Sequence, residues 1–403
     1  MNLRWRLALL TASLLVLLLW MPLVGTEAVS AEPEEEGNGI REKIIEQQAK
    51  QLPTDQVEAY WDNLMNEYSE HLPGKDPPTL MEMIVPGGEG LGAQEVLQGL
   101  VRMLLFEIVY NGKLLVTIVI LTIFSMLMET LQGAFEKPNV SKIAYAITYI
   151  VLMIIAVNSF SVAIGYAKEA IAGMVHFMIA MIPLLLTVLA SMGNVVTVSV
   201  MHPLIVFMIH TIGTLIYSVV FPLLFFSAVL HIVSSLSDKY KVTHLAILLR
   251  NISVGILGVC LTVFLGVISV QGVSAGTTDG VTLRTAKYVT GNFVPVVGRM
   301  LSDASDTVIG ASLLVKNAIG LFGVIVIVLL CIFPALKILA LALIYNLSAA
   351  VLQPLGDSPI MLGLRTIGQS MIYVFAALAS VGLMFFFAIT IMIAAGNVTV
   401  MMR

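Results

Sequence analysis

The amino-acid sequence predicts an all-α polytopic membrane protein with about seven transmembrane helices. Three observations predict this fold class. Apolar residues make up 58% of the 403-residue chain and charged residues only 11%, whereas soluble globular chains hold about 45–50% and about 25%. The apolar residues also gather in runs of about 18 or more, the length that a helix needs to cross a bilayer. Finally, 15 acidic and 4 basic residues fall between positions 32 and 100, so an acidic segment precedes the apolar body.

Residues 1–31 have the pattern of a secretory signal peptide. Arg4 and Arg6 precede the apolar stretch Leu7–Trp20, and the small residues of Val29–Ala31 suit signal peptidase. The apolar stretch is shorter than the ~20 residues of a spanning helix, which favours cleavage. Uncleaved anchoring stays open because Met21–Val24 extends the stretch. In both cases the residues that follow lie outside the cytoplasm.

Residues 32–100 are predicted to form an acidic extracytoplasmic helical segment with a linker. Apolar residues recur at helical spacing in two pieces within residues 40–72, and Thr54-Asp55 begins the second piece. Prolines and glycines indicate that residues 71–92 are a linker. Two short helices cannot bury a sizeable core alone. We therefore expect the segment to pack on the membrane body or on a partner.

Residues 101–403 form the predicted multi-span transmembrane helical domain. An interfacial helix at Val101–Tyr110 leads into the first span, and prolines inside the longer spans predict kinks or tilt. An external N-terminus followed by seven passages places the C-terminus in the cytoplasm, and a modest excess of basic residues in the loops on that side agrees with this orientation. The predicted spans are Leu114–Leu131, Ile143–Ile164, Ile171–Met192, Pro203–Val233, Leu245–Val270, Ala318–Leu347 and Ser370–Ala395.

A polar stretch at 271–310 interrupts this domain and is predicted to be a functional loop or a re-entrant segment. Gly272, Ser274 and Gly276 have the spacing of a hydrolase nucleophile elbow, but that motif requires a strand–turn–helix setting in a soluble sheet. We interpret it instead as a tight loop at the membrane surface. Short helices or a re-entrant hairpin would satisfy the backbone of so long a connection. An ordinary cytoplasmic loop with amphipathic pieces is the alternative.

The candidate functional residues are charged groups of this stretch and one lysine inside a predicted span. Lys337 follows Pro334, and a charge within the bilayer costs at least ~2.5 kcal/mol. Its ammonium group therefore either faces the bundle interior or reaches the interface along its own stem. The candidates are Arg284, Lys287, Arg299, Asp303, Asp306 and Lys337.

The sequence predicts no enzyme, no cofactor, no metal site and no nucleic-acid partner. Cys260 and Cys331 lie in apolar runs without CxxC spacing, which excludes a disulfide framework and favours packing roles. The histidines lack an HExxH pattern. Small residues such as Ala376 and Ser380 in the last span allow close helix contact, either within one chain or between copies, so a homo-oligomer stays open.

Several motifs resemble the stage III sporulation protein AE family of endospore-forming bacteria. They run from Val270–Gly276 through Arg284–Tyr288 to Asn292–Gly298, with Pro334–Lys337 and Gln353–Asp357 as further matches. The resemblance covers essentially the whole chain, including the order of signal peptide, acidic external segment and polytopic body. It implies an integral protein of the mother-cell membrane around the forespore, and it carries over no catalytic residues.

The resemblance also implies a role in the complex that links mother cell and forespore after engulfment and supports late forespore gene expression. Its expected partners are other stage III sporulation proteins, namely a secretion-type ATPase and ring-forming proteins. We expect a membrane platform or export-gate-like component whose acidic external helices contact the ring proteins. The segment Gln271–Val308 would then face the cytoplasm and engage the ATPase or line a path. The alternative is an independent small-molecule permease that uses Lys337 and kinked helices; inverted repeats would favour it.

Overall fold

The computed structural model describes residues 48, 52, 54–68, 93–131, 139–236, 241–293, 297–355 and 358–401. The predicted signal peptide and most of the predicted linker lie outside these residues. No strand occurs within the described ranges, which are almost entirely helical. The predicted all-α fold class is therefore confirmed.

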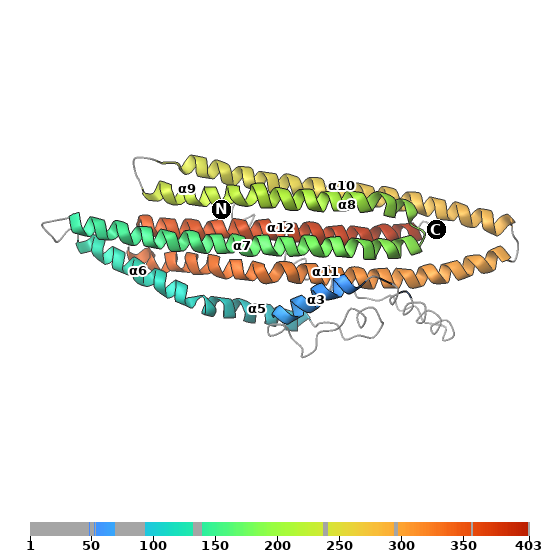
Figure 1. The fold of residues 1–403 in the computed structure, drawn as a ribbon, viewed down its shortest axis with the longest axis horizontal. Coiled ribbons are helices and arrows are strands. Elements are labelled where there is room, and N and C mark those ends of the chain that lie inside the picture. The colour runs from blue at the N-terminus through green and yellow to red at the C-terminus, as the bar shows by residue number, and fades with distance from the viewer. Residues whose placement is uncertain are drawn as a thin grey trace.

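Five long helical elements run antiparallel, side by side, and form an elongated bundle (Figure 1). The second of them contains one turn of π-helix, η1, one turn before Pro222. Proline has no N–H to donate to the preceding turn. The wider hydrogen-bond spacing of a π-turn accommodates this missing donor without ending the helix. The elements are α7 (Asn139–Ser191), α8 (Val195–Leu215) with η1 (Ile216–Val220) and α9 (Phe221–Leu236), α10 (Thr243–Phe293), α11 (Val297–Leu352) and α12 (Pro359–Met401).

Shorter helices complete the fold. Helices α5 (Ala93–Tyr110) and α6 (Gly112–Leu131) meet at a bend of 44° and pack along α7 and α11. Helix α3 (Asp55–Tyr68) lies on α7, and the short 3-10 turn η2 (Gln353–Leu355) follows α11.

The bundle is built around α12, and α10 lies at its periphery. In the most apolar stretch of α12, 72% of the residues are buried, against 22% in α10. Large side chains fill the interior, among them the fully buried Phe177, Phe322 and Phe385. Glycines permit the closest approaches: a Cβ at Gly382 of α12 would lie 2.6 Å from the Sγ of Cys331. Both cysteines are free thiols.

The number of spans differs from the prediction of about seven. Within the described residues, five helices are long and apolar enough to cross a membrane, or six if the bent pair α5–α6 counts as one span. The two predicted spans Ile143–Ile164 and Ile171–Met192 are one continuous helix, α7. Lys168 and Glu169 interrupt the apolar pattern between them, but charged residues do not break a helix.

In its described residues, 271–293 and 297–310, the predicted loop or re-entrant segment is also helical. Helix α10 continues through Gly272–Gly276 to Phe293, and α11 begins at Val297. Threonine hydroxyls in this stretch donate to carbonyls one turn earlier, as Thr278 does to Ser274 and Thr282 to Thr278. These hydroxyls satisfy their hydrogen bonding within their own helix. A polar composition is therefore compatible with a regular helical backbone here. The interpretation of Ser274 as part of a tight loop was wrong.

The long helices exceed the thickness of a bilayer. The shortest of the five apolar stretches, Pro359–Asn397, has 39 residues, or about 59 Å at about 1.5 Å per residue. The hydrocarbon core is about 30 Å thick, and even a tilt of about 40° leaves a projected length of about 45 Å. If the bundle crosses a bilayer, part of every long helix lies outside the hydrocarbon.

Candidate functional site at one end of the bundle

The α10–α11 hairpin extends beyond the rest of the bundle. Figure 1 shows the end of α10 and the start of α11 projecting past the α7–α8 turn and past the C-terminal end of α12. Asp279 of α10 contacts the first turn of α8. The residues from 280 to the end of α10 at Phe293 therefore lie beyond that level, a projection of about 20 Å at about 1.5 Å per residue.

A buried carboxylate anchors the base of this hairpin. The two oxygens of Asp279 accept hydrogen bonds from the backbone N–H groups of Val196 (2.9 Å) and Thr197 (2.8 Å). These donors belong to the first turn of α8, where Asn194 makes no side-chain cap. Asp279 is only 2% exposed, so it caps α8 from a neighbouring helix and places negative charge at the positive end of the helix dipole.

The turn before α8 interlocks with the same stretch of α10. Gly193 has a φ of +86°, a left-handed conformation that suits glycine. A Cβ at this position would also lie 2.9 Å from a terminal methyl carbon of Leu283. Together Gly193, Leu283 and Asp279 fix the direction in which the hairpin leaves the bundle.

The predicted charged residues of the polar stretch fall on this hairpin or just at its base. Arg284 and Asp306 are exposed, whereas the side chains of Lys287, Arg299 and Asp303 lie outside the described residues. Arg284 has exposed apolar and aromatic neighbours on α10: Val281 is 56% and Tyr288 73% exposed. A cation beside exposed aromatic and apolar groups is typical of a surface that binds a partner.

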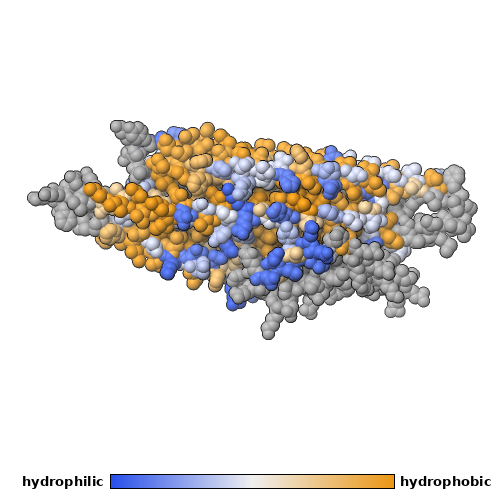
Figure 2. All heavy atoms as spheres, viewed as in Figure 1, coloured by the Kyte–Doolittle hydropathy of each residue, from blue (hydrophilic) through white to orange (hydrophobic). Residues whose placement is uncertain are grey.

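The acidic helix α3 packs on the middle of the bundle, and Gln48, which precedes α3, lies nearer the hairpin end. Trp61 is 3% exposed and its ring lies 5.2 Å from that of Phe322 on α11. Gln48 hydrogen-bonds Ser312 of α11, whose hydroxyl accepts from Ser191 at the last residue of α7. The segment thus packs on the membrane body, one of the two predicted possibilities. Hydrophilic side chains gather around the place where α3 crosses the bundle (Figure 2).

The C-terminal part of α12 reaches this end as well. Lys316 of α11, one turn from Ser312, donates from Nζ to the backbone oxygen of Ile393 (2.9 Å) and to the side-chain oxygen of Asn397. The N-terminal segment at Gln48 and the end of α12 therefore share one end of the bundle. Seven passages would have placed them at opposite ends.

Lys316 is not among the candidates from the sequence, because it lies just outside the predicted span Ala318–Leu347. It is 0% exposed, and both acceptors of its ammonium group are neutral. Gly396 leaves the room for this side chain, because a Cβ there would lie 2.8 Å from Nζ. The signal available in the sequence was that the apolar pattern continues on both sides of the lysine.

Lys337 does not belong to the same site. It is half-buried, and its Nζ lies 5.6 Å from the centre of the Tyr166 ring on α7. A second lysine at this level, Lys168, lies 4.2 Å over the ring of Tyr217. Along α11, Lys337 is about 46 Å from Asp306 at about 1.5 Å per residue. The six predicted residues therefore form a hairpin group and a separate lysine in the middle of the bundle.

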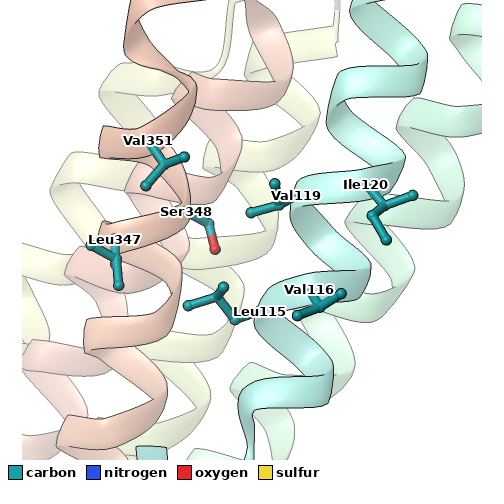
Figure 3. Close-up of a pocket in the computed structure, with 7 residues that line it drawn as sticks. All are labelled: Leu115, Val116, Val119, Ile120, Leu347, Ser348 and Val351. Atoms are coloured by element: carbon teal, nitrogen blue, oxygen red, sulfur yellow. The ribbon is translucent and has the colours of Figure 1, made fainter.

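A groove between α6 and α11 has the character of a lipid-chain site rather than a polar pathway. Figure 3 shows its walls, which are the aliphatic residues Leu115, Val116, Val119, Ile120, Leu347 and Val351 with one serine, Ser348. The hydroxyl of Ser348 donates to the carbonyl of Ile344 within its own helix (2.7 Å). The groove of about 200 Å³ thus presents almost only hydrocarbon.

Comparisons with known proteins agree with the motifs. The sequence model of the family described as stage III sporulation protein AE matches residues 76–396. The chain is 52% identical over 376 residues to stage III sporulation protein AE of Bacillus subtilis (strain 168), and the match covers 93% of this chain and 94% of that protein. No solved structure matches the chain.

Proposed function

Because the chain belongs to the stage III sporulation protein AE family, we propose that it is a membrane platform or export-gate-like component of the channel linking mother cell and forespore. It acts after engulfment and is needed for late forespore gene expression. It resides in the mother-cell membrane around the forespore, and its partners are other proteins of the same operon. Its role is to hold an assembly in place, without catalysis of its own.

The observation that carries this proposal is the length of the bundle. A chain that only conducts a small molecule needs helices as long as the bilayer is thick, about 20 residues. Here the apolar helical stretches have 39 to 49 residues, and a hairpin extends one end further. The α10–α11 hairpin carries polar residues at this end, and Gln48 of the N-terminal segment joins α11 close to it. Such a projection supplies a rigid surface, above the membrane, on which other proteins can assemble.

The two partner surfaces expected from the sequence lie at one end rather than at opposite ends. Gln48 and Ser312 join the N-terminal segment to the end from which the hairpin projects. If the N-terminal segment is exported, the hairpin also lies outside the cytoplasm. We therefore propose that α3 and the hairpin together contact the ring-forming proteins between the two membranes. The ATPase then meets the other end of the bundle.

The packing of the interior disfavours the permease alternative. Fully buried aromatic side chains such as Phe177, Phe322 and Phe385 occupy the middle of the bundle, where a single-chain transporter keeps its substrate site. Lys337 lies against an aromatic ring instead of a substrate cavity. A transport path would therefore have to form between this chain and other subunits.

The test is deletion of the gene in its spore-forming host, followed by complementation. We expect sporulation to stop after engulfment is complete, with late forespore gene expression lost and restored by the wild-type chain. A charge reversal on the hairpin, Arg284→Glu, should fail to complement although the protein accumulates in the membrane. The matched control is Arg102→Glu, an exposed arginine on α5. Normal spores from the deletion strain would overturn the proposal.

A further inference from the structure

A cationic pocket opens between α9, α10 and α12 at the end of the bundle opposite the hairpin. It encloses about 290 Å³. None of its lining residues carries a carboxylate, while two arginines and one histidine contribute to its walls. It is lined by Ser227, His231, Thr243, Ile247, Arg250, Leu362, Arg365, Thr366, Gln369, Ser370 and Tyr373.

The positive charge of this pocket comes from its arginines, while two of its hydroxyls donate to backbone carbonyls of the protein itself. The hydroxyl of Ser227 donates to the carbonyl of Ala246 (2.7 Å), and that of Ser370 donates to Thr366 (2.8 Å). Arg250 lies over the ring of Tyr373, with its guanidinium carbon 5.1 Å from the ring centre. A guanidinium group carries several N–H donors in a planar fork, a geometry that suits a phosphate.

With the excess length of the helices at the hairpin end, the pocket at the opposite end lies at the level of the polar headgroups of a bilayer. Arg250 is eight residues into α10, which begins at Thr243, and Arg365 is seven residues into α12, which begins at Pro359. Both arginines are thus about 10 Å from the start of their helices at about 1.5 Å per residue. Both helices continue from there as apolar spans. Arginine within two turns of the end of a span is typical of an interfacial position.

Apolar side chains surround this cationic pocket. Leu245 and Leu248 on α10 are 49% and 54% exposed, and Leu362 on α12 is 57% exposed. A free inorganic anion makes no apolar contact with these leucines, whereas the acyl chains of a lipid would pack on them. The cationic pocket therefore suits the anionic headgroup of an amphipathic molecule, and the apolar side chains around it suit that molecule's acyl chains.

We propose that this pocket binds the phosphodiester headgroup of an anionic phospholipid, with Arg250 and Arg365 as its principal ligands. Basic pockets between transmembrane helices recognise anionic headgroups in this way. The bound lipid fixes α10, the peripheral helix, against α9 and α12 at the membrane surface. This site is independent of the proposed platform function and lies on other residues than the hairpin.

The test is lipid binding to the full-length protein purified in detergent, followed by native mass spectrometry. The probes are dioleoyl phosphatidylglycerol, dioleoyl phosphatidylcholine and inorganic phosphate. We expect the wild-type protein to retain phosphatidylglycerol in preference to phosphatidylcholine. The double variant Arg250→Gln/Arg365→Gln should bind phosphatidylglycerol at least about tenfold more weakly, because charge-assisted hydrogen bonds are lost at two sites.

The matched control removes two cations elsewhere. Arg102 and Lys113 are exposed on α5 and α6, and Arg102→Gln/Lys113→Gln should bind phosphatidylglycerol like the wild type. Equal binding by the pocket variant and the wild type would overturn the proposal. Displacement of the lipid by millimolar inorganic phosphate would assign the pocket to a free anion instead. If the double pocket variant does not fold, each single arginine variant is measured, and a loss is required at each.

Discussion

The contact between Asp279 and the first turn of α8 can be tested by a single substitution. In Asp279→Ala the N–H groups of Val196 and Thr197 lose both acceptors, which lie at 2.9 and 2.8 Å in the wild type. The site is buried, with Asp279 only 2% exposed, so water does not readily replace the carboxylate. The substitution therefore leaves two backbone donors at a helix start without partners.

The expected loss follows from the type of bond. A hydrogen bond to a charged group contributes about 1.5–3 kcal/mol, and loss of a helix N-cap costs about 0.5–2 kcal/mol. Because both bonds belong to one cap, their contributions are not independent, and we expect a total loss of about 3 kcal/mol in the free energy of unfolding. Asp279→Asn keeps one acceptor oxygen for one of the two backbone N–H groups. Its amide NH2 would face the other backbone N–H group, donor against donor, so we expect a loss of about 2 kcal/mol.

The assay is equilibrium unfolding of the purified protein in mixed micelles by titration with dodecyl sulfate, read by far-UV circular dichroism. The control is Asp62→Asn, which neutralises an exposed carboxylate on α3, and it should change the free energy of unfolding by less than about 0.5 kcal/mol. An Asp279→Asn variant as stable as the control would refute the reasoning. In that case α8 would begin without help from α10, and the hairpin would not be anchored by this carboxylate.

Two further substitutions test the packing. Gly382→Ala should destabilise the bundle by about 1–3 kcal/mol, because the new Cβ would lie 3.1 Å from the Cβ of Cys331. Gly258→Ala, at a position with nothing within 4 Å, should be neutral or stabilising in the same unfolding titration; equal effects would contradict the packing around α12. Trp61→Ala should release α3 at a cost of about 3–5 kcal/mol and expose residues 55–68 to rapid hydrogen exchange. The exposed neighbour Asp62→Ala should leave exchange unchanged, and unchanged exchange in Trp61→Ala would mean that α3 is held elsewhere.

Long apolar helices could be predicted from the sequence because lipid solvation leaves a clear signal in composition. The all-α fold class was correct for this reason, and most predicted spans lie within observed helices. The division of α7 into Ile143–Ile164 and Ile171–Met192 was wrong, because a hydropathy pattern reports where charges occur and not where a helix ends. Lys168 and Glu169 interrupt the hydropathy pattern, but helix α7 continues through them. The same confusion turned the helical stretch around Thr278 into a predicted loop.

The site was only partly predictable, because its residues meet through tertiary packing. Arg284 and Asp306 were found from their unusual polar surroundings in the sequence. The contact between Asp279 and Val196 joins positions 83 residues apart, and no local pattern indicates it. Lys316 is not found from the sequence, because the acceptors that allow its burial, at Ile393 and Asn397, lie about 80 residues away along the chain.

Lys316 gives a test that separates stability from function. Its burial removes an ammonium group from water, at an effective cost of several kcal/mol, and the two hydrogen bonds to Ile393 and Asn397 return a similar amount. Lys316→Met, which keeps the unbranched shape, should therefore leave the free energy of unfolding within about 1 kcal/mol of the wild type. Lys316→Ala should lose about 2–5 kcal/mol, because it leaves a cavity. If the lysine is kept for its charge, the methionine variant will be stable in the membrane and still fail to support sporulation. A methionine variant that sporulates normally would make Lys316 a packing residue and would leave the hairpin as the functional surface at this end.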